Sequence, residues 1–249
     1  MNEFYKTEGI IIGKRDFSEA DKLLIVLTPD MGKITIKAKG LKKTLAKMSG
    51  HLELFNQVKI EMVQGRTFFI ATGAQTIENF NNAKNDFSRM STLYYLGELV
   101  NNLVPDHIPQ KEVYQNLVQA IAMVSANTFD MAIVTLSFEV QLLHLLGYKP
   151  ELGNCVVCHN AVIAEGFCMS VEKGGVMCTV CGHDDWQTRT LSTNALKAMR
   201  LMGSYNFDTV SKVRIEQGIV GELRSILDLL LEQQMGKRLK SRSFLQAIV

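Results

Sequence analysis

Four of the five cysteines occur as two Cys-x-x-Cys pairs, and this pattern constrains the fold more than any other feature of the sequence. The pairs are Cys155 with Cys158 and Cys178 with Cys181, and 19 residues separate them. Each pair can present two thiolates to one tetrahedral ion, and the residues between the pairs are enough to fold back and bring them together. We therefore expect a four-cysteine metal site that holds together a segment with few apolar residues of its own.

Zinc is the metal that we expect, as one structural ion, because four thiolates make a closed and redox-silent site. A catalytic zinc keeps one position open, which four cysteines would close. An iron–sulfur cluster uses the same ligands, and four thiols without a metal are a further alternative. Cys168 has no paired cysteine and is interpreted as a small core residue, whereas His159 and His183 are interpreted as surface residues or neighbours of the site.

The first 80 residues have the pattern of short β-strands, because β-branched and aromatic residues are dense in five segments that turn residues separate. Residues 29–32 (PDMG) predict a tight hairpin, since Pro suits the second position of a turn and Gly the left-handed one. Five strands without a long helix fit a small barrel, and the OB barrel is the common solution of that size. The expected strands are 5–14, 21–28, 33–39, 53–64 and 66–73.

From about residue 84 the apolar residues follow a helical period. Segment 128–147 is apolar on all sides, which is typical of a helix buried at the centre of a bundle. Gly147 and Pro150 are expected to end it. The expected helices are 88–104, 111–126, 128–147, 193–203 and 217–235.

The sequence thus predicts an α+β protein of several domains. We expect an OB-fold barrel at 1–80, a helical domain at 81–150 that resumes at 191–249, and a four-cysteine zinc module inserted at 151–190. Of the 249 residues 47% are apolar, which excludes global disorder. The polar start MNEFYKTEG and the lack of an apolar run that could span a bilayer lead us to expect a cytoplasmic protein.

Charge is distributed unevenly along the chain. The formal net charge is +2, but it is the sum of +3 over residues 1–80, −5 over 81–190 and +4 over 191–249. Two basic ends around an acidic middle indicate an anionic partner more strongly than the total does.

Six lysines and no acidic residue lie between Met31 and Leu52. Strand alternation in 33–39 places its lysines on one face, and a basic loop follows, which is an arrangement that suits a phosphate backbone. Lysines on a strand also protect a sheet edge, and cations at the chain's end can complement a helix dipole. The expected DNA-binding residues, including the end of the first strand and the C-terminal tail, are Lys14, Arg15, Lys33, Lys37, Lys39, Lys42, Lys43, Lys47, Lys237, Arg238, Lys240 and Arg242.

Aromatic residues for base stacking are less clearly marked. Phe68 and Phe69 point to opposite faces of a strand, so at most one of them can be exposed. Tyr5 and Phe17 are the other candidates, although each of the four is more often a core residue than a stacking platform.

No catalytic residues are expected. Gly9, Gly13 and Lys14 superficially match a phosphate-binding loop, but three residues rather than four separate the glycines and no Ser or Thr follows the lysine. The sequence has no GxGxxG, GxSxG or HExxH motif. A metal-dependent enzyme acting on nucleotides is therefore only a minor alternative.

Two stretches of the sequence resemble the bacterial DNA repair protein RecO family. They are GIIIGKRDFSEADKLLIVLTPDMGKITIKAKGLKK at 9–43 and LGYKPELGNCVVC at 146–158. The order of barrel, helices, four-cysteine insertion and helices extends the resemblance over the whole chain. Not every member of the family keeps the four cysteines, and this chain has them all.

The resemblance implies a non-enzymatic recombination mediator. Such a protein binds single- and double-stranded DNA, anneals complementary strands and works with RecR. It receives the C-terminal tail of single-stranded DNA-binding protein on its helical domain and acts on RecA indirectly, in the cytoplasm at the nucleoid. The alternative from another class is a zinc-ribbon scaffold that binds proteins without contacting DNA.

Overall fold

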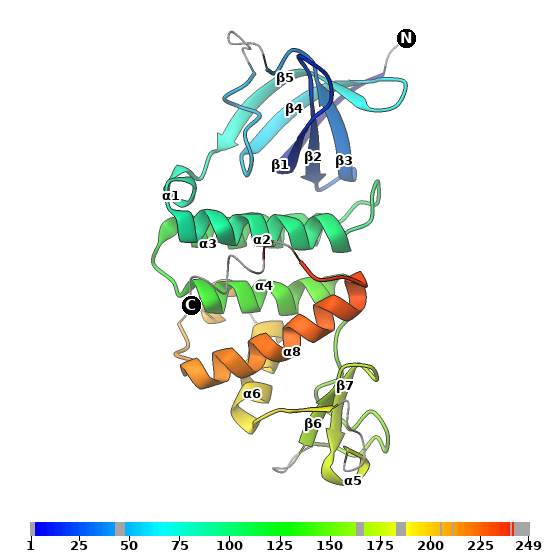
Figure 1. The fold of residues 1–249 in the computed structure, drawn as a ribbon, viewed down its shortest axis with the longest axis vertical. Coiled ribbons are helices and arrows are strands. Elements are labelled where there is room, and N and C mark those ends of the chain that lie inside the picture. Colours follow the sequence, from blue (N-terminus) through cyan, green and yellow to red (C-terminus); the bar gives the residue numbers. More distant parts are fainter. Residues whose placement is uncertain are drawn as a thin grey trace. The chain divides into compact units, whose positions relative to one another are not determined.

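A computed structural model gives the fold and describes residues 3–42, 48–162, 167–182, 188–204, 206–210, 212–239 and 241 (Figure 1). The chain forms two compact units. The first runs from the N-terminus to Ala126 and includes Ser241, and the second is Asn127–Leu239. The four-part division at residues 80, 150 and 190 stays a prediction. The helices that follow the barrel, up to Ala126, belong to the same unit as the barrel.

The first unit begins with a closed barrel of five strands, in the order β1-β2-β3-β5-β4. Neighbouring strands are antiparallel except β3 and β5, which run parallel. A small closed barrel of five strands is the OB arrangement, so the predicted fold class is confirmed. The strands are β1 (Phe4–Asp16), β2 (Lys22–Thr28), β3 (Gly32–Ala38), β4 (Gln57–Gln64) and β5 (Phe69–Glu78).

Side chains alternate between the two faces of each strand, and the apolar ones that point inward fill the barrel. In β3, Ile34, Ile36 and Ala38 are buried in the interior, where they meet apolar residues from the other strands. Most strand boundaries lie within two residues of the sequence prediction, but three differ by more: β5 ends at 78 rather than 73, and two strands begin later than predicted. β4 begins at 57 rather than 53, because Phe55 has a left-handed φ of 61° and turns the chain. β5 begins at 69 rather than 66, because a turn precedes it in which Gly65 N donates to Phe68 O at 3.1 Å.

The predicted hairpin between β2 and β3 is present. Gly32 takes a φ of 70°, and Thr28 Oγ1 donates to the Gly32 carbonyl at 2.8 Å. A Cβ at this position would lie 2.2 Å from the carbonyl oxygen of Ile108. Glycine is therefore required here both by the left-handed turn and by the close approach of the 104–110 connection.

Three helices complete the first unit: α1 (Asn81–Lys84), α2 (Phe87–Leu103) and α3 (Lys111–Ala126). Asp86 begins α2 by accepting a hydrogen bond from Arg89 N at 2.9 Å, as a helix N-cap does. The barrel packs on α2 through Phe55, whose ring lies 5.3 Å from that of Tyr94 and close to Gly97.

The second unit is built around α4 (Met131–Leu145), which contacts α6 (Thr193–Ser204), α7 (Phe207–Val210) and α8 (Gln217–Met235). The central position predicted for this helix is confirmed. Its one buried acid, Glu139, is completely inaccessible and forms an ion pair with Arg224 of α8. A buried carboxylate needs such a partner because burial removes its hydration.

The cysteine-containing segment forms a small sheet with the order β7-β6-β8. Its elements are β6 (Phe167–Ser170), β7 (Gly175–Cys178), the one-turn helix α5 (Thr179–Gly182) and β8 (Thr188–Thr190). Among the helices of the described residues, none is long and apolar enough to cross a membrane.

Candidate nucleic-acid interface and metal centre

The four paired cysteines meet at one point. The Sγ atoms of Cys155, Cys158, Cys178 and Cys181 all lie within 4.8 Å of one another, and those of Cys158 and Cys178 are 3.8 Å apart. Four thiolates at about 2.3 Å from a tetrahedral zinc ion lie roughly 3.8 Å from each other. The cluster therefore has the dimensions to hold one metal ion with four thiolate ligands.

Local backbone structure brings the two pairs together. The first pair forms a knuckle in which His159 N donates to Cys155 O at 2.9 Å, and His159 takes a left-handed φ of 62°. The second pair spans the end of β7 and helix α5. Val156 N donates to Val176 O at 2.9 Å and fixes the first knuckle against β7.

Two thiols of the cluster, Cys155 and Cys181, have pKa values shifted in opposite directions. Burial acts to raise the pKa of Cys155, but hydrogen bonds from the backbone, including those of Cys158 and Cys178, lower it to about 6. The hydrogen bond with Cys178 and the charge of Cys155 raise the pKa of Cys181 to about 12. Ionisation of Cys155 thus opposes ionisation of Cys181, whereas a divalent ion would offset the repulsion between the two thiolates.

Cys168 is not part of this group. It is half-buried, and its Sγ lies 3.9 Å from Met177 O and beside Gly182. Its interpretation as a packed residue agrees with this position. His159 is exposed, as expected, and His183 lies outside the described residues.

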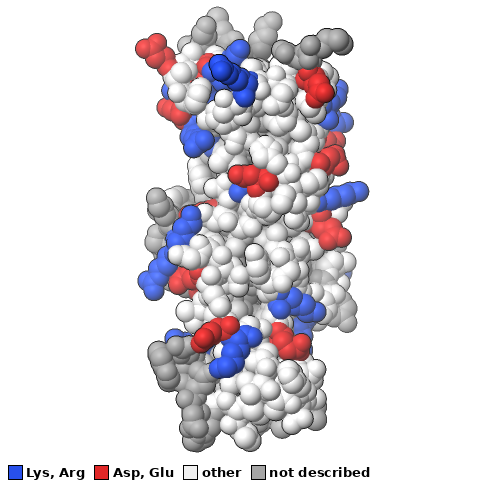
Figure 2. Space-filling model, turned by 90° about the vertical axis from the view of Figure 1, so that its right-hand side faces the viewer, with Lys and Arg blue, Asp and Glu red and all other residues white. Residues whose placement is uncertain are grey.

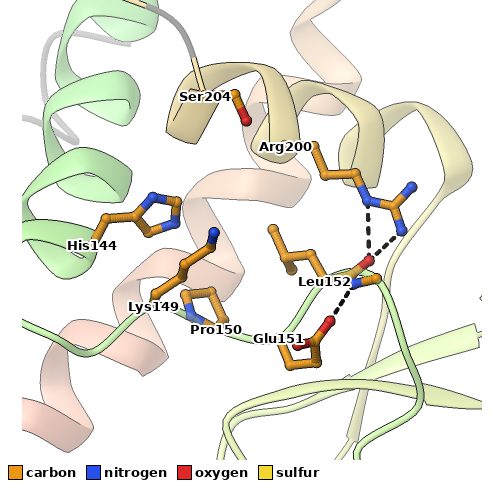
Figure 3. Close-up of a pocket in the computed structure, with 8 residues that line it drawn as sticks. His144, Lys149, Pro150, Glu151, Leu152, Arg200 and Ser204 are labelled. Carbon is orange, nitrogen blue, oxygen red and sulfur yellow. Dashed lines mark hydrogen bonds between the residues drawn. The ribbon is translucent and has the colours of Figure 1, made fainter. Parts of the chain in front are cut away.

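The chain that leads into the cysteines is anchored to α6 (Figure 3). Arg200 donates from Nε to the carbonyl oxygen of Leu152 at 3.0 Å and also from Nη2. Glu151 accepts from Gly153 N at 2.6 Å and Asn154 N at 2.9 Å, and these bonds hold its pKa below the ordinary value. These bonds fix the backbone immediately before the first knuckle.

A polar cavity of about 340 Å³ lies beside this anchor, with His144, Lys149 and Ser204 on its walls (Figure 3). Burial, and then the charge of Lys149, lower the pKa of His144, so the imidazole is neutral near pH 7.

The barrel carries the other group of predicted site residues. In β3 the predicted alternation is present, but the lysines have different surroundings. Lys33 is only 8% exposed, and its Nζ donates to Asn101 O at 2.5 Å and lies 3.3 Å from Asp106. The expectation of an open Lys33 on the basic face is corrected: this side chain is buried against the end of α2 and the 104–110 connection.

Lys37 and Lys42 lie next to the turn formed by residues 16–21. The Lys37 Nζ is 2.9 Å from Asp21 Oδ2, and the Lys42 Nζ is 3.1 Å from Asp16 Oδ2. Lys22, which the sequence analysis did not single out, lies 3.6 Å from Asp16 Oδ1. The structure thus gathers three lysines around the acids of one turn.

Of the other predicted basic residues, Arg15 and Lys39 are exposed, and no carboxylate in the described part of the chain forms an ion pair with either. Lys14 is mostly buried and pairs with Glu53 at 2.8 Å. Lys237 and Arg238 are exposed beyond α8 in the second unit. Lys43, Lys47, Lys240 and Arg242 lie outside the described residues.

Two aromatic rings accompany the lysines. Phe17, in the 16–21 turn, is 47% exposed, and its ring meets that of Phe68 edge to face with centroids 5.8 Å apart. The Lys37 ammonium lies 4.7 Å from the centre of the Phe17 ring. Tyr5 and Phe69 instead pack against each other at 5.3 Å, and Phe69 belongs to the barrel core. Phe17 and Phe68 are therefore the aromatic pair that lies at the basic surface.

The face of the molecule in Figure 2 carries blue and red side chains interspersed, so the charges coloured there do not form one extended patch of a single sign. In the group around the 16–21 turn, lysines and acids are likewise in contact.

Comparison with known proteins identifies the family. The family model described as "Recombination protein O N terminal" matches residues 1–80, and the one described as "Recombination protein O C terminal" matches residues 84–243. The chain belongs to the RecO family. It is 33% identical to DNA repair protein RecO of Dehalococcoides mccartyi over 92% of both chains.

Other RecO proteins give the same result. DNA repair protein RecO of Roseiflexus sp. is 30% identical over 98% of this chain and 86% of its own length. That of Symbiobacterium thermophilum is 27% identical over 98% and 97%. The two family matches meet between residues 80 and 84, where the barrel ends and α1 lies. RecO membership supports a role in DNA repair for this chain.

Proposed function

We propose that this RecO-family protein is a recombination mediator that binds single- and double-stranded DNA through its barrel. The observation that supports this most directly is the surface formed by Arg15, Lys37, Lys39, Lys42 and Phe17, which we call the basic–aromatic surface. Flexible cations can bind phosphates without regard to sequence, and an exposed aromatic ring can stack on a base.

Annealing of complementary strands follows from the same chemistry. Two polyanions approach one another only if their charge is partly neutralised, and a surface with several cations supplies this without a catalytic group. We accordingly propose that the protein acts as a mediator rather than as an enzyme. It would work with RecR, engage the C-terminal tail of single-stranded DNA-binding protein and act on RecA indirectly, in the cytoplasm at the nucleoid.

We further propose that the cysteine cluster holds one structural zinc ion. The sulfur separations suit a tetrahedral ion, and four thiolates leave no position for a substrate. Its role would be to stabilise the small sheet of the second unit, with an indirect effect on DNA binding.

Annealing of two complementary labelled oligonucleotides tests the DNA-binding proposal. The triple variant Lys37→Ala, Lys39→Ala, Lys42→Ala should anneal the strands more slowly than the unchanged protein. The control is Lys6→Ala with Lys59→Ala, which removes two lysines that lie elsewhere on the barrel, on β1 and β4, and pair with Glu61 and Glu8. Equal loss in both variants would contradict a role for the basic–aromatic surface, and no annealing by the unchanged protein would favour a scaffold that does not contact DNA.

A further inference from the structure

The turn of residues 16–21, which we call the acidic turn, is held firmly beside the lysines. Asp21 N bonds to Ser18 Oγ at 3.2 Å, and Lys42 N bonds to Ala20 O at 3.0 Å. Lys42 also reaches back with its ammonium group to Ser18 O at 2.8 Å. Its acids therefore occupy defined positions relative to the lysines of the basic–aromatic surface.

The two paired acids of the turn have different surroundings. The Asp21 side chain is 17% exposed, and its Oδ1 accepts a hydrogen bond from Gly40 N at 2.8 Å, where Gly40 has a φ of 66°. That carboxylate helps to fix the chain after β3. The Asp16 side chain is 70% exposed, and among the described residues its partners are the ammonium groups of Lys22 and Lys42.

Both acids are ionised near neutral pH. A hydrogen bond from Lys42 is the main cause that lowers the pKa of Asp16, and the hydrogen bond from Gly40 does so for Asp21. A carboxylate and a DNA phosphate offer the same kind of anionic oxygen to an ammonium group. Asp16 therefore holds two lysines in the way that a phosphate would.

We propose that Asp16 is a built-in competitor of DNA: its carboxylate occupies the phosphate position between Lys22 and Lys42 and must be displaced when the barrel binds a strand. This inference rests on the proposed DNA binding by the basic–aromatic surface. It assigns Lys22 to the contact surface and gives the acidic turn a role in weakening and releasing bound strands. A protein that brings strands together and then leaves the duplex benefits from such release.

Binding of a fluorescent single-stranded oligonucleotide to the full-length protein at low salt tests the proposal. Asp16→Asn keeps the shape of the side chain and removes its charge, and we expect it to tighten binding by about two- to five-fold, the range for loss of an exposed ion pair. Glu19→Gln is the matched control. It removes the same charge from the same turn, where no lysine or arginine of the described residues pairs with Glu19, and it should change binding less.

A double variant shows whether Asp16 acts through its partner. In a Lys42→Ala background the gain from Asp16→Asn should shrink, because one of the two competing contacts no longer exists. The variants should melt at the temperature of the unchanged protein, and Asp16→Ser is a second neutral replacement if the amide disturbs the turn. Equal effects of Asp16→Asn and Glu19→Gln, or an undiminished gain in the Lys42→Ala background, would overturn the competitor role.

The same experiment separates this inference from the function on which it rests. If the unchanged protein binds DNA, Lys42→Ala weakens binding and Asp16→Asn has no effect, the competitor role fails alone. If the unchanged protein does not bind the oligonucleotide at low salt, the proposed function fails and the competitor role fails with it.

Discussion

Arg200 donates a hydrogen bond from Nε to the carbonyl oxygen of Leu152 at 3.0 Å, and so ties helix α6 to the chain that enters the four-cysteine cluster. Leu152 is buried, so its carbonyl has little access to water as an alternative partner. The four-cysteine cluster is thus positioned by a helix that follows it in the sequence as well as by its own small sheet.

Arg200→Ala should lower the free energy of unfolding by about 1–3 kcal/mol, because it leaves a buried carbonyl without its charged donor. Chemical denaturation followed by circular dichroism measures this change. Arg189→Ala is the control, since Arg189 is exposed on β8 and its side chain bonds only to the neighbouring Thr188 O among described residues. An equal effect of the two replacements would contradict the anchoring role of Arg200.

Cys178→Ser should remove the bound metal and lower the stability of the second unit, because one of four ligands is lost. Metal analysis of the purified protein should give about one zinc ion per chain before the change and much less after it. Cys168→Ser is the matched control, since this thiol lies outside the cluster, and it should retain the metal. A stable, metal-free Cys178→Ser protein would show that the site is not structural.

Phe17→Ala should weaken binding of single-stranded DNA by about 1–3 kcal/mol if its ring stacks on a base. Fluorescence anisotropy with a short oligonucleotide gives the two dissociation constants. Phe4→Ala is a suitable control because Phe4 is also exposed, at 60%, but lies at the start of β1. Equal losses in the two variants would argue against stacking on Phe17.

Replacement of Lys33 by alanine should affect stability, and replacement of Lys39 should affect DNA binding, although both residues belong to the lysine run of the sequence. Lys33→Ala should lower the melting temperature, because Asn101 O loses its donor. Lys39→Ala should leave the melting temperature unchanged and weaken DNA binding, since Lys39 is exposed. The assignment of Lys33 to packing would be contradicted if its replacement weakened DNA binding at full stability.

Lys84 should make the stability of the protein depend on pH. Burial lowers the pKa of Lys84 to about 8, an effect that Glu53 opposes and Lys14 reinforces. Below about pH 8 the folded protein therefore carries the full free-energy cost of a partly buried charge on Lys84. As the pH rises from about 8 towards the unfolded pKa of about 10.4, the folded protein loses this proton first and the cost is relieved. Relative to Lys84→Met, the free energy of unfolding should rise over that interval, by on the order of 1 kcal/mol since the side chain is half exposed.

Denaturant titrations at several pH values in this range test the sign of that difference. Lys111→Met is the control, because Lys111 is an exposed lysine at the start of α3. If the difference in free energy of unfolding between the unchanged protein and Lys84→Met does not change with pH, burial does not lower the pKa of Lys84.

The barrel and the four-cysteine cluster could be predicted from the sequence because both depend on short-range patterns. Alternation in 33–39 fixed which residues of β3 enter the core, and the two Cys-x-x-Cys pairs identified all four members of the cluster. The all-round apolar character of 128–147 likewise predicted the central helix, α4.

The surroundings of the lysines could not be predicted in this way, because they depend on contacts between distant parts of the chain. Lys33 is buried by Asn101 and the connection after α2, some seventy positions further on. Lys22 and Lys42 meet Asp16 only once the β1-β2-β3 register is formed. The sequence showed the lysine run by itself, and only the fold shows that acids of the 16–21 turn pair with lysines of that run.

The central claim, that the barrel binds DNA through phosphates, is tested most directly by equilibrium binding of a single-stranded oligonucleotide to the unchanged protein across a series of salt concentrations. We expect the logarithm of the binding constant to fall linearly with the logarithm of the salt concentration, with a slope of about −0.7 for each phosphate contacted and with little dependence on sequence. Binding that is absent, or that does not change with salt, would contradict the account.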